Sequence, residues 1–147
     1  MHLRNKRIFL VEDNLAYRAL AQLLLERAGA KTAIERWGTE SIARIRAFMP
    51  VDVILLDLHL PDNVSGFDLF DDIRAEPDLK HIPIVAVSSM EPSFAIPKAK
   101  AKGFEGFILK PIESALFVSQ VADVLASRKV WFAGVPSFVR RSPERSE

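Results

Sequence analysis

This 147-residue sequence contains no cysteine and no long hydrophobic run. Without cysteine it has neither a disulfide framework nor thiolate chemistry, which fits a reducing compartment. None of its apolar runs approaches the ~20 residues that a membrane-spanning helix needs. Near the N-terminus, Ile8–Val11 is too short for the hydrophobic region of a signal peptide. We therefore expect a cytoplasmic protein that does not associate with a membrane.

The sequence also has few glycines and no large excess of either charge. Val11-Glu12-Asp13-Asn14 follows the first apolar run, where a dinucleotide-binding enzyme would carry a glycine-rich turn, so that class of enzyme is excluded. The formal net charge is +1, with 15 Lys and Arg against 17 Asp and Glu in residues 1–127. Such a balance provides no electrostatic case for direct binding of nucleic acid.

The most informative stretch runs from Val51 to Pro61. Val53–Leu56 is an apolar run typical of a strand that is buried on both faces. Asp57 comes directly after it, so its carboxylate should emerge at the carboxyl edge of a sheet, where open α/β sheets bind their ligands. Taken alone, Asp57 could equally start a turn or cap a helix.

Strands and helices alternate along the rest of the chain. Helical spacing of apolar residues and capping signals place a helix after each predicted strand. The predicted strands are 6–11, 30–34, 53–56, 81–87 and 106–109, and the predicted helices are 15–28, 39–49, 67–76, 92–102 and 111–127. Pro92 and Pro97 should leave the fourth helix short or frayed at its start. This alternation predicts a doubly wound parallel sheet with helices on both faces, in one domain.

Parallel strands end at one edge, which should bring together the polar residues that follow them. These are Glu12, Asp13, Asp57, Ser88 and Lys110. Three crowded carboxylates repel one another, and an all-oxygen, carboxylate-rich set suits Mg²⁺. An Asp nucleophile with a metal, a lysine and a hydroxyl suits phosphoryl transfer onto the Asp57 carboxylate.

The same residues resemble the receiver domain of two-component response regulators. The resemblance rests on Glu12-Asp13, on Asp57-Leu58-His59-Leu60-Pro61, on Ser88 after its strand, and on Phe107-Ile108-Leu109-Lys110-Pro111. It covers about residues 5–127. It implies a five-stranded sheet in the order 2-1-3-4-5, the flavodoxin-like and CheY-like arrangement. It also implies a signalling switch, not an enzyme. From the length of the chain we expect no attached effector domain.

The resemblance further implies a role for each site residue. Asp57 would accept a phosphoryl group from a sensor histidine kinase or a histidine phosphotransfer protein. The side chains of Asp13 and Asp57 and the backbone carbonyl of His59 would hold Mg²⁺, and Glu12 would act through water. Lys110 would contact the phosphoryl group. Ser88 and Phe107 occupy the switch positions, where phosphorylation would draw Ser88 toward the phosphate and let Phe107 move inward. An unknown downstream protein would then bind differently at the face made by the fourth helix, fifth strand and fifth helix.

The sequence departs from the usual pattern of this family at several positions. Glu12 replaces the commoner Asp, and its longer side chain still reaches a metal-bound water. Gly66 lies one residue later than the usual turn glycine, which indicates an insertion beside the site. Phe107 replaces the commoner Tyr, so no signal passes through a phenol hydroxyl at this position.

Several alternatives remain open at this point. Lys110 could be a surface lysine, Ser88 a cap, Phe107 plain core, and the His59 imidazole an exposed loop group. A phosphatase with an Asp nucleophile would want a second Asp where His59 stands. A pseudo-receiver that binds partners without phosphorylation would not need the complete set of acids, hydroxyl and lysine.

Residues 128–147 are predicted to form a C-terminal tail that is partly disordered. They hold 5 Lys and Arg against 2 Asp and Glu. Trp131 and Phe132 are unusual for a disordered tail, which is commonly poor in aromatics. We expect Val130–Phe132 to pack on the domain or on a second copy of it, as in a homodimer, while Arg140 onward stays mobile.

Overall fold

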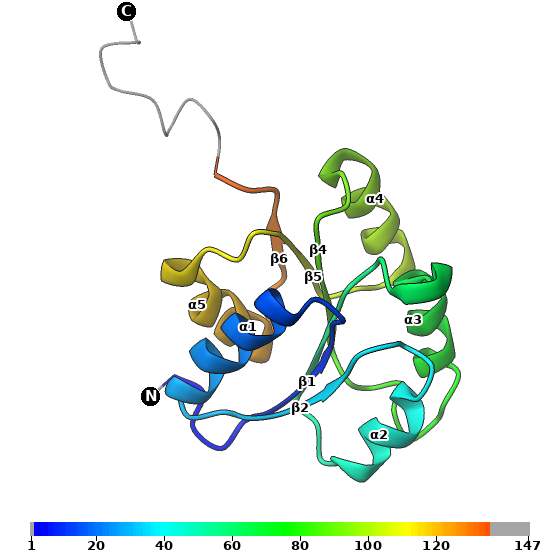
Figure 1. The fold of residues 1–147 in the computed structure, drawn as a ribbon, viewed down its shortest axis with the longest axis horizontal. Coiled ribbons are helices and arrows are strands. Elements are labelled where there is room, and N and C mark those ends of the chain that lie inside the picture. The colour runs from blue at the N-terminus through cyan, green and yellow to red at the C-terminus, as the bar shows by residue number, and fades with distance from the viewer. Residues whose placement is uncertain (1, 136–147) are drawn as a thin grey trace, which may run out of the picture.

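The computed structural model describes residues 2–135, which form a sheet with helices on both sides (Figure 1). The strands are β1 (Arg7–Val11), β2 (Lys31–Glu35), β3 (Val53–Leu56), β4 (Ile84–Ser88), β5 (Gly106–Leu109) and β6 (Val130–Phe132). The helices are α1 (Leu15–Arg27), α2 (Ser41–Ala47), α3 (Gly66–Arg74), α4 (Pro92–Lys102) and α5 (Ser114–Leu125), with a 3₁₀ turn at Pro61–Asn63. The predicted alternation of strand and helix is confirmed.

All neighbouring strands in the sheet are parallel, in the order β2-β1-β3-β4-β5-β6. The first five strands have the expected order. The expected number of strands is wrong by one, because Val130–Phe132 adds a sixth strand beside β5. A run of three apolar residues carries too little local signal to be predicted as a strand. It is a strand here because the free edge of β5 offers it backbone partners, such as Glu105 O, which accepts from Val130 N at 3.3 Å.

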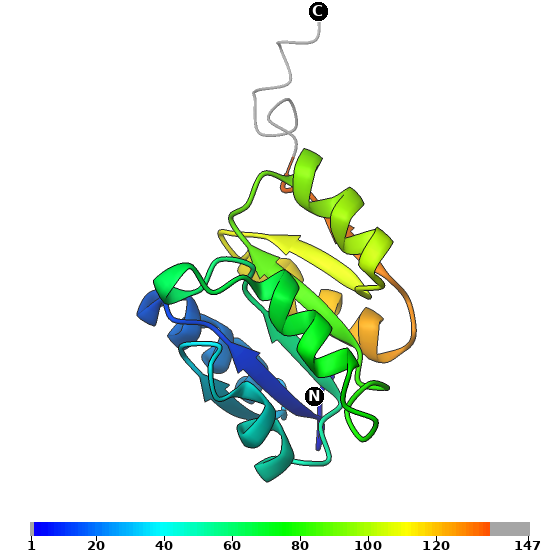
Figure 2. The ribbon, with the colours of Figure 1, turned by 90° about the vertical axis from the view of Figure 1, so that its right-hand side faces the viewer.

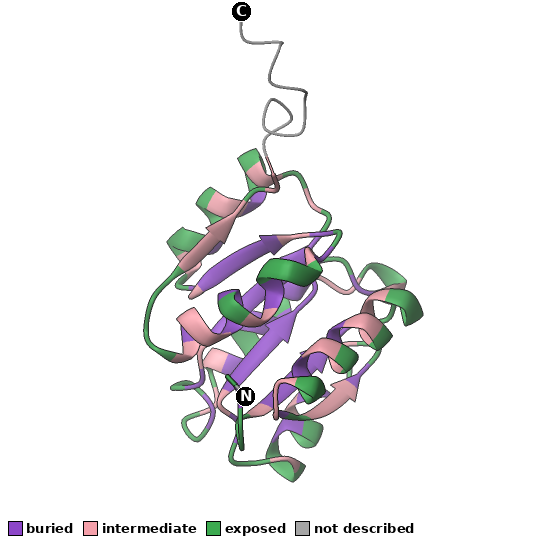
Figure 3. Ribbon diagram, turned by 90° about the vertical axis from the view of Figure 1, so that its left-hand side faces the viewer, coloured by how far each residue is buried: buried purple, intermediate pink, exposed green. Residues whose placement is uncertain are grey.

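The sheet separates two hydrophobic cores, because successive side chains of a strand point to opposite faces. In β1, Phe9 and Val11 face α2, α3 and α4, whereas Ile8 and Leu10 face α1 and α5. Figure 2 shows α2, α3 and α4 in front of the sheet, and Figure 3 shows the opposite face with buried central strands. Burial on both faces explains why β3 is a continuous apolar run rather than an alternating one.

β6 follows the same alternation and extends both cores. Trp131 packs against the core on the α4 side, while Val130 and Phe132 pack against the core on the α5 side. The Lys100 ammonium of α4 lies 5.1 Å from the centre of the Trp131 ring. The aromatic pair therefore lies on the domain itself, within residues that we had assigned to a tail. The predicted mobility of Arg140 onward concerns residues outside the described part of the chain.

The fourth helix is more regular than its prolines led us to expect. α4 runs through Pro97 from Pro92 to Lys102. Pro92 occupies the first turn, where its missing N–H costs nothing, and the Glu91 carboxylate accepts from Ser93 N at 3.4 Å.

Within residues 2–135, no helix combines the length and apolar character needed to cross a membrane.

Candidate functional site

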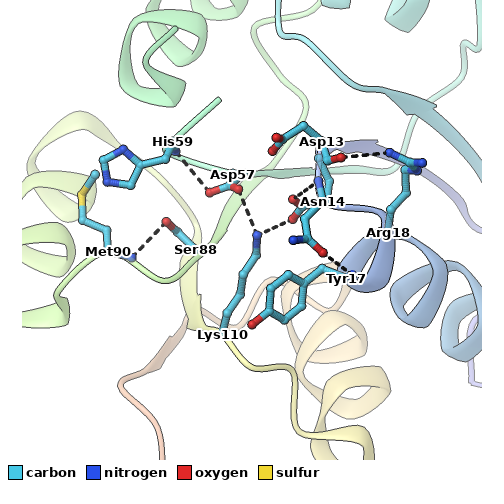
Figure 4. Close-up of polar contacts among 10 residues, drawn as sticks. Asp13, Asn14, Tyr17, Arg18, Asp57, His59, Ser88, Met90 and Lys110 are labelled. Atoms are coloured by element: carbon cyan, nitrogen blue, oxygen red, sulfur yellow. Dashed lines mark hydrogen bonds and ion pairs between the residues drawn. The ribbon is translucent and has the colours of Figure 1, made fainter. Parts of the chain in front are cut away.

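The strand ends meet at one edge of the sheet, and Asp57 lies at the centre of this edge (Figure 4). Its main-chain N–H donates to Val11 O at 3.0 Å, which ties the end of β3 to the end of β1. Only 6% of Asp57 is exposed. Its Oδ1 accepts from the His59 N–H at 3.2 Å, and its Oδ2 accepts from the Lys110 Nζ at 2.9 Å. Asp57 is therefore a nearly buried carboxylate whose oxygens both have partners.

The other two acids come from the loop between β1 and α1. Glu12 is 6% exposed, whereas Asp13 is exposed to solvent. One carboxylate oxygen from each of Glu12, Asp13 and Asp57 lies within 4.8 Å of the others. Asn14 ends this loop as the N-cap of α1, with Oδ1 accepting from Tyr17 N at 3.0 Å. The predicted convergence of the three carboxylates is present in the structure.

Lys110 is the cation that faces these acids. It follows β5, where its N–H donates to Ser88 O at 2.9 Å. Its Nζ lies 2.5 Å from Glu12 Oε1 and 2.9 Å from Asp57 Oδ2, and only 4% of its side chain is exposed. Lys110 is therefore no surface lysine, and it neutralises part of the acidic charge.

The electrostatics of the cluster follow from burial and crowding. Burial raises the pKa of Glu12, and the charge of Asp57 acts in the same direction, while Lys110 opposes both. Burial alone would lower the pKa of Lys110, but the charges of Asp57 and Glu12 outweigh it and raise that pKa. Lys110 therefore stays charged, and the cluster holds more negative charge than one ammonium cancels.

Ser88 and His59 border the cluster on the side of β4 and β3. Ser88 is completely buried, and its Oγ accepts from Met90 N at 3.2 Å, so it also organises the turn after β4. The His59 side chain is exposed, and Figure 4 shows its imidazole directed away from Asp57 and beside Met90. His59 reaches the site through its backbone rather than through its ring.

Gly66 has a part in the site that the sequence did not reveal. A Cβ at Gly66 would lie 2.2 Å from the backbone oxygen of Asp57, so only glycine lets α3 begin this close to Asp57. Gly66 N donates to Leu58 O at 3.0 Å. The turn between Asp57 and Gly66 has left-handed backbone at Asp62 (φ 58°) and Asn63 (φ 60°).

Phe107 is fully buried in the core between the sheet and the helices α2, α3 and α4. The Phe107 ring therefore lies inside the core in this structure. Trp131 of β6 lies beside it as its partner in the parallel pair.

The donor set of this edge fits Mg²⁺. Three carboxylates converge, all donors are oxygens, and Asp13 is open to solvent so that bound waters can complete the shell. The Asp57 carboxylate lies beside both the other two acids and a buried ammonium. This arrangement can neutralise an incoming phosphoryl group from two sides.

Comparison with known proteins assigns a family to this geometry. The model of the response regulator receiver domain family matches residues 8–122. The polar-differentiation response regulator DivK of Brucella ovis is 32% identical over 120 residues, which cover 82% of this chain and 96% of that protein.

Solved structures with this fold are also similar to the chain. The chemotaxis response regulator CheY4 of Vibrio cholerae has a TM-score of 0.73 and 23% identity, covering 82% of this chain and 98% of that chain. The phosphorylated cyanobacterial phytochrome response regulator RcpA has a TM-score of 0.65 and 30% identity, covering 84% and 90%. The first of these supports the fold alone.

Proposed function

Because the chain belongs to the response regulator receiver domain family, we propose that it is a phosphorylation-controlled switch whose phosphoacceptor is Asp57. The phosphoryl group would come from a sensor histidine kinase or a histidine phosphotransfer protein. The observation that carries this proposal is the contact of the nearly buried Asp57 carboxylate with Lys110 inside a cluster of three acids. The similar protein RcpA, described as phosphorylated, supports it.

In the proposed reaction, an Asp57 carboxylate oxygen attacks the phosphorus of the donor in line. A new P–O bond forms to Asp57, and the bond from phosphorus to the donor atom breaks, with its electron pair leaving on the donor. Lys110 donates N–H groups to the phosphoryl oxygens, and Ser88 can donate its hydroxyl to one of them once it releases Met90 N.

The metal in this proposal is Mg²⁺, which when bound would neutralise charge on the phosphoryl oxygens. Asp13 and Asp57 would hold it through their side chains and His59 through its main-chain carbonyl. Glu12 would act through a water, since its two oxygens already accept from Lys110 and Asn14.

The output of the switch would be a change in the binding of a downstream protein, which makes this a signalling module rather than an enzyme. Ser88 and Phe107 are the proposed switch residues, acting on the face made by α4, β5 and α5. β6 lies along β5 on this face, so a partner would meet α4 and α5 with β6 between them. We propose a cytoplasmic location, protein partners rather than nucleic acid or a membrane, and a homodimer as one form of association.

Labelling with a small phosphodonor tests the proposal. Incubation with acetyl phosphate and Mg²⁺ should add one phosphoryl group per chain, which intact-mass spectrometry measures. Asp57→Asn should prevent the addition, whereas Asp52→Asn, at the other end of β3, is the matched control and should leave it intact. An Asp57→Asn protein that is labelled like the wild type would overturn the assignment.

A further inference from the structure

Tyr17 provides the Lys110 ammonium with a second neighbour besides the acids. The Nζ of Lys110 lies 4.5 Å from the centre of the Tyr17 ring. The ring belongs to the first part of α1, and Figure 4 shows it beside the end of the Lys110 side chain. Lys110 therefore has an aromatic ring as well as two carboxylates as neighbours.

A closed set of contacts fixes this ring relative to the acids. Glu12 Oε2 accepts from Asn14 N at 3.0 Å, and Asn14 Oδ1 accepts from Tyr17 N at 3.0 Å. The ring then contacts Lys110, whose Nζ returns to Glu12. The same loop thus presents the Glu12 carboxylate and positions the aromatic ring.

The carboxylates and the ring act on Lys110 in different ways. A carboxylate holds an ammonium by its charge and by accepting hydrogen bonds from the N–H groups. A metal ion competes with the ammonium for the same carboxylate oxygens. An aromatic face attracts the cation through its quadrupole, and it has no affinity for a hard metal ion. If a metal draws the Asp57 carboxylate away from Lys110, the ring would remain as a neighbour that restrains the flexible lysine side chain.

We propose that Tyr17 is a positioning residue that holds the Lys110 ammonium beside Asp57 through its aromatic face during phosphoryl transfer. This role rests on the function proposed above. Lys110 must reach the phosphoryl oxygens as the bond from Asp57 to phosphorus forms and acetate leaves with its electron pair. A lysine that is held in place loses less freedom in that step.

The test compares initial rates of Asp57 phosphorylation by acetyl phosphate and Mg²⁺. Removing the ring with Tyr17→Leu should lower the rate by about fivefold, in the range expected for a partly desolvated cation–π contact. Tyr17→Phe, which keeps the ring without the hydroxyl, should restore the rate to within about twofold of the wild type. The matched control is Leu23→Ala, an exposed apolar residue on the same helix, which should have no effect.

Two further measurements separate positioning from a structural defect. The endpoint of one phosphoryl group per chain and the Mg²⁺ affinity should be the same in Tyr17→Leu and the wild type. In a double-mutant cycle, Tyr17→Leu should cause no further loss when Lys110 is already replaced in Lys110→Met. If Tyr17→Leu does not fold, Tyr17→Met should show the same slower rate.

Several outcomes would overturn the proposal. A wild-type rate in Tyr17→Leu would remove any role of the ring, and a Tyr17→Phe rate as low as that of Tyr17→Leu would assign the effect to the hydroxyl. Independent losses in the double-mutant cycle would show that Tyr17 does not act through Lys110. If the wild type itself is not labelled at Asp57, the proposed function fails, which is a different result from a failure confined to Tyr17.

Discussion

Trp131 lies directly beside Phe107, its register partner in the parallel pair of β5 and β6. Both side chains belong to the core between the sheet and the helices α2, α3 and α4. A buried residue at a proposed switch position is thus paired with a half-buried indole at the edge of the sheet. Any movement of Phe107 or α4 should alter the surroundings of that indole.

Trp131 fluorescence should therefore report phosphorylation. Trp37 is the other tryptophan and is exposed, so we propose the measurement in Trp37→Phe. Addition of acetyl phosphate with Mg²⁺ should shift the emission of Trp131, whereas the same protein with Asp57→Asn should show no shift. Labelling of Asp57 without any change in emission would indicate that the switch does not reach β6.

Removal of β6 should destabilise the domain without removing its chemistry. A chain that ends at Ser127 loses the partly buried Val130, Trp131 and Phe132, which we expect to cost roughly 2 kcal/mol of unfolding free energy. Urea unfolding measures this loss, and a chain that ends at Val135 is the control that keeps β6. Asp57 should still be labelled, because each proposed site residue lies at or before Lys110; loss of labelling would place β6 within the functional unit.

Gly66→Ala should disturb both stability and phosphorylation. The added Cβ would lie 2.2 Å from Asp57 O, so α3 or the acceptor strand must move. We expect a loss of about 1–3 kcal/mol in unfolding free energy, as for other overpacked sites, together with slower labelling of Asp57. Asp68→Ala, at an exposed residue in the first turn of α3, is the control. Unchanged stability in Gly66→Ala would mean that the loop relaxes without cost.

Substitution of the acids should reveal their different metal roles. If Asp13 binds Mg²⁺ directly and Glu12 acts through water, Asp13→Asn should weaken Mg²⁺ binding by about 100-fold and Glu12→Gln by about tenfold. Titration calorimetry measures both affinities. Equal affinities in the two variants would contradict the division of roles, and labelling that persists after chelation of Mg²⁺ would contradict the metal requirement.

The pKa of Glu12 predicts how metal-free stability depends on pH. Burial raises this pKa above its ordinary value of 4.5, so the folded protein binds the proton more tightly than the unfolded chain. Stability should then fall as pH rises from 4.5 through the raised value, and the full penalty should remain near neutral pH. We expect Glu12→Gln in a chelator to be more stable than the wild type near neutral pH, on the order of 1 kcal/mol.

Urea unfolding across this pH range measures the difference between the two proteins. It should shrink as the pH is lowered toward 4.5, where Glu12 itself becomes protonated. A less stable Glu12→Gln protein near neutral pH would show that the bond from Glu12 to Lys110 outweighs the repulsion and the cost of burial.

The sequence by itself determined the order of the first ten elements and the convergence of Glu12, Asp13 and Asp57. These follow from local pattern, because an apolar run, its flanking breakers and the residue that ends it are all close together in the chain. Parallel strands then bring their ends to one edge without any further information. The resemblance to receiver domains added the expected strand order and the expected role of each site residue.

Only the tertiary structure decided the features that depend on contacts between distant segments. The place of Val130–Phe132 depends on an open edge of β5, and a stretch of three residues does not predict that pairing. The need for glycine at position 66 depends on how closely α3 approaches Asp57. Tyr17 belongs to a helix whose pattern reads as ordinary, and its contact with Lys110 arises because β1 and β5 end at the same edge of the sheet. Backbone hydrogen bonds and side-chain packing between such segments set these distances, and no local pattern of residues encodes them.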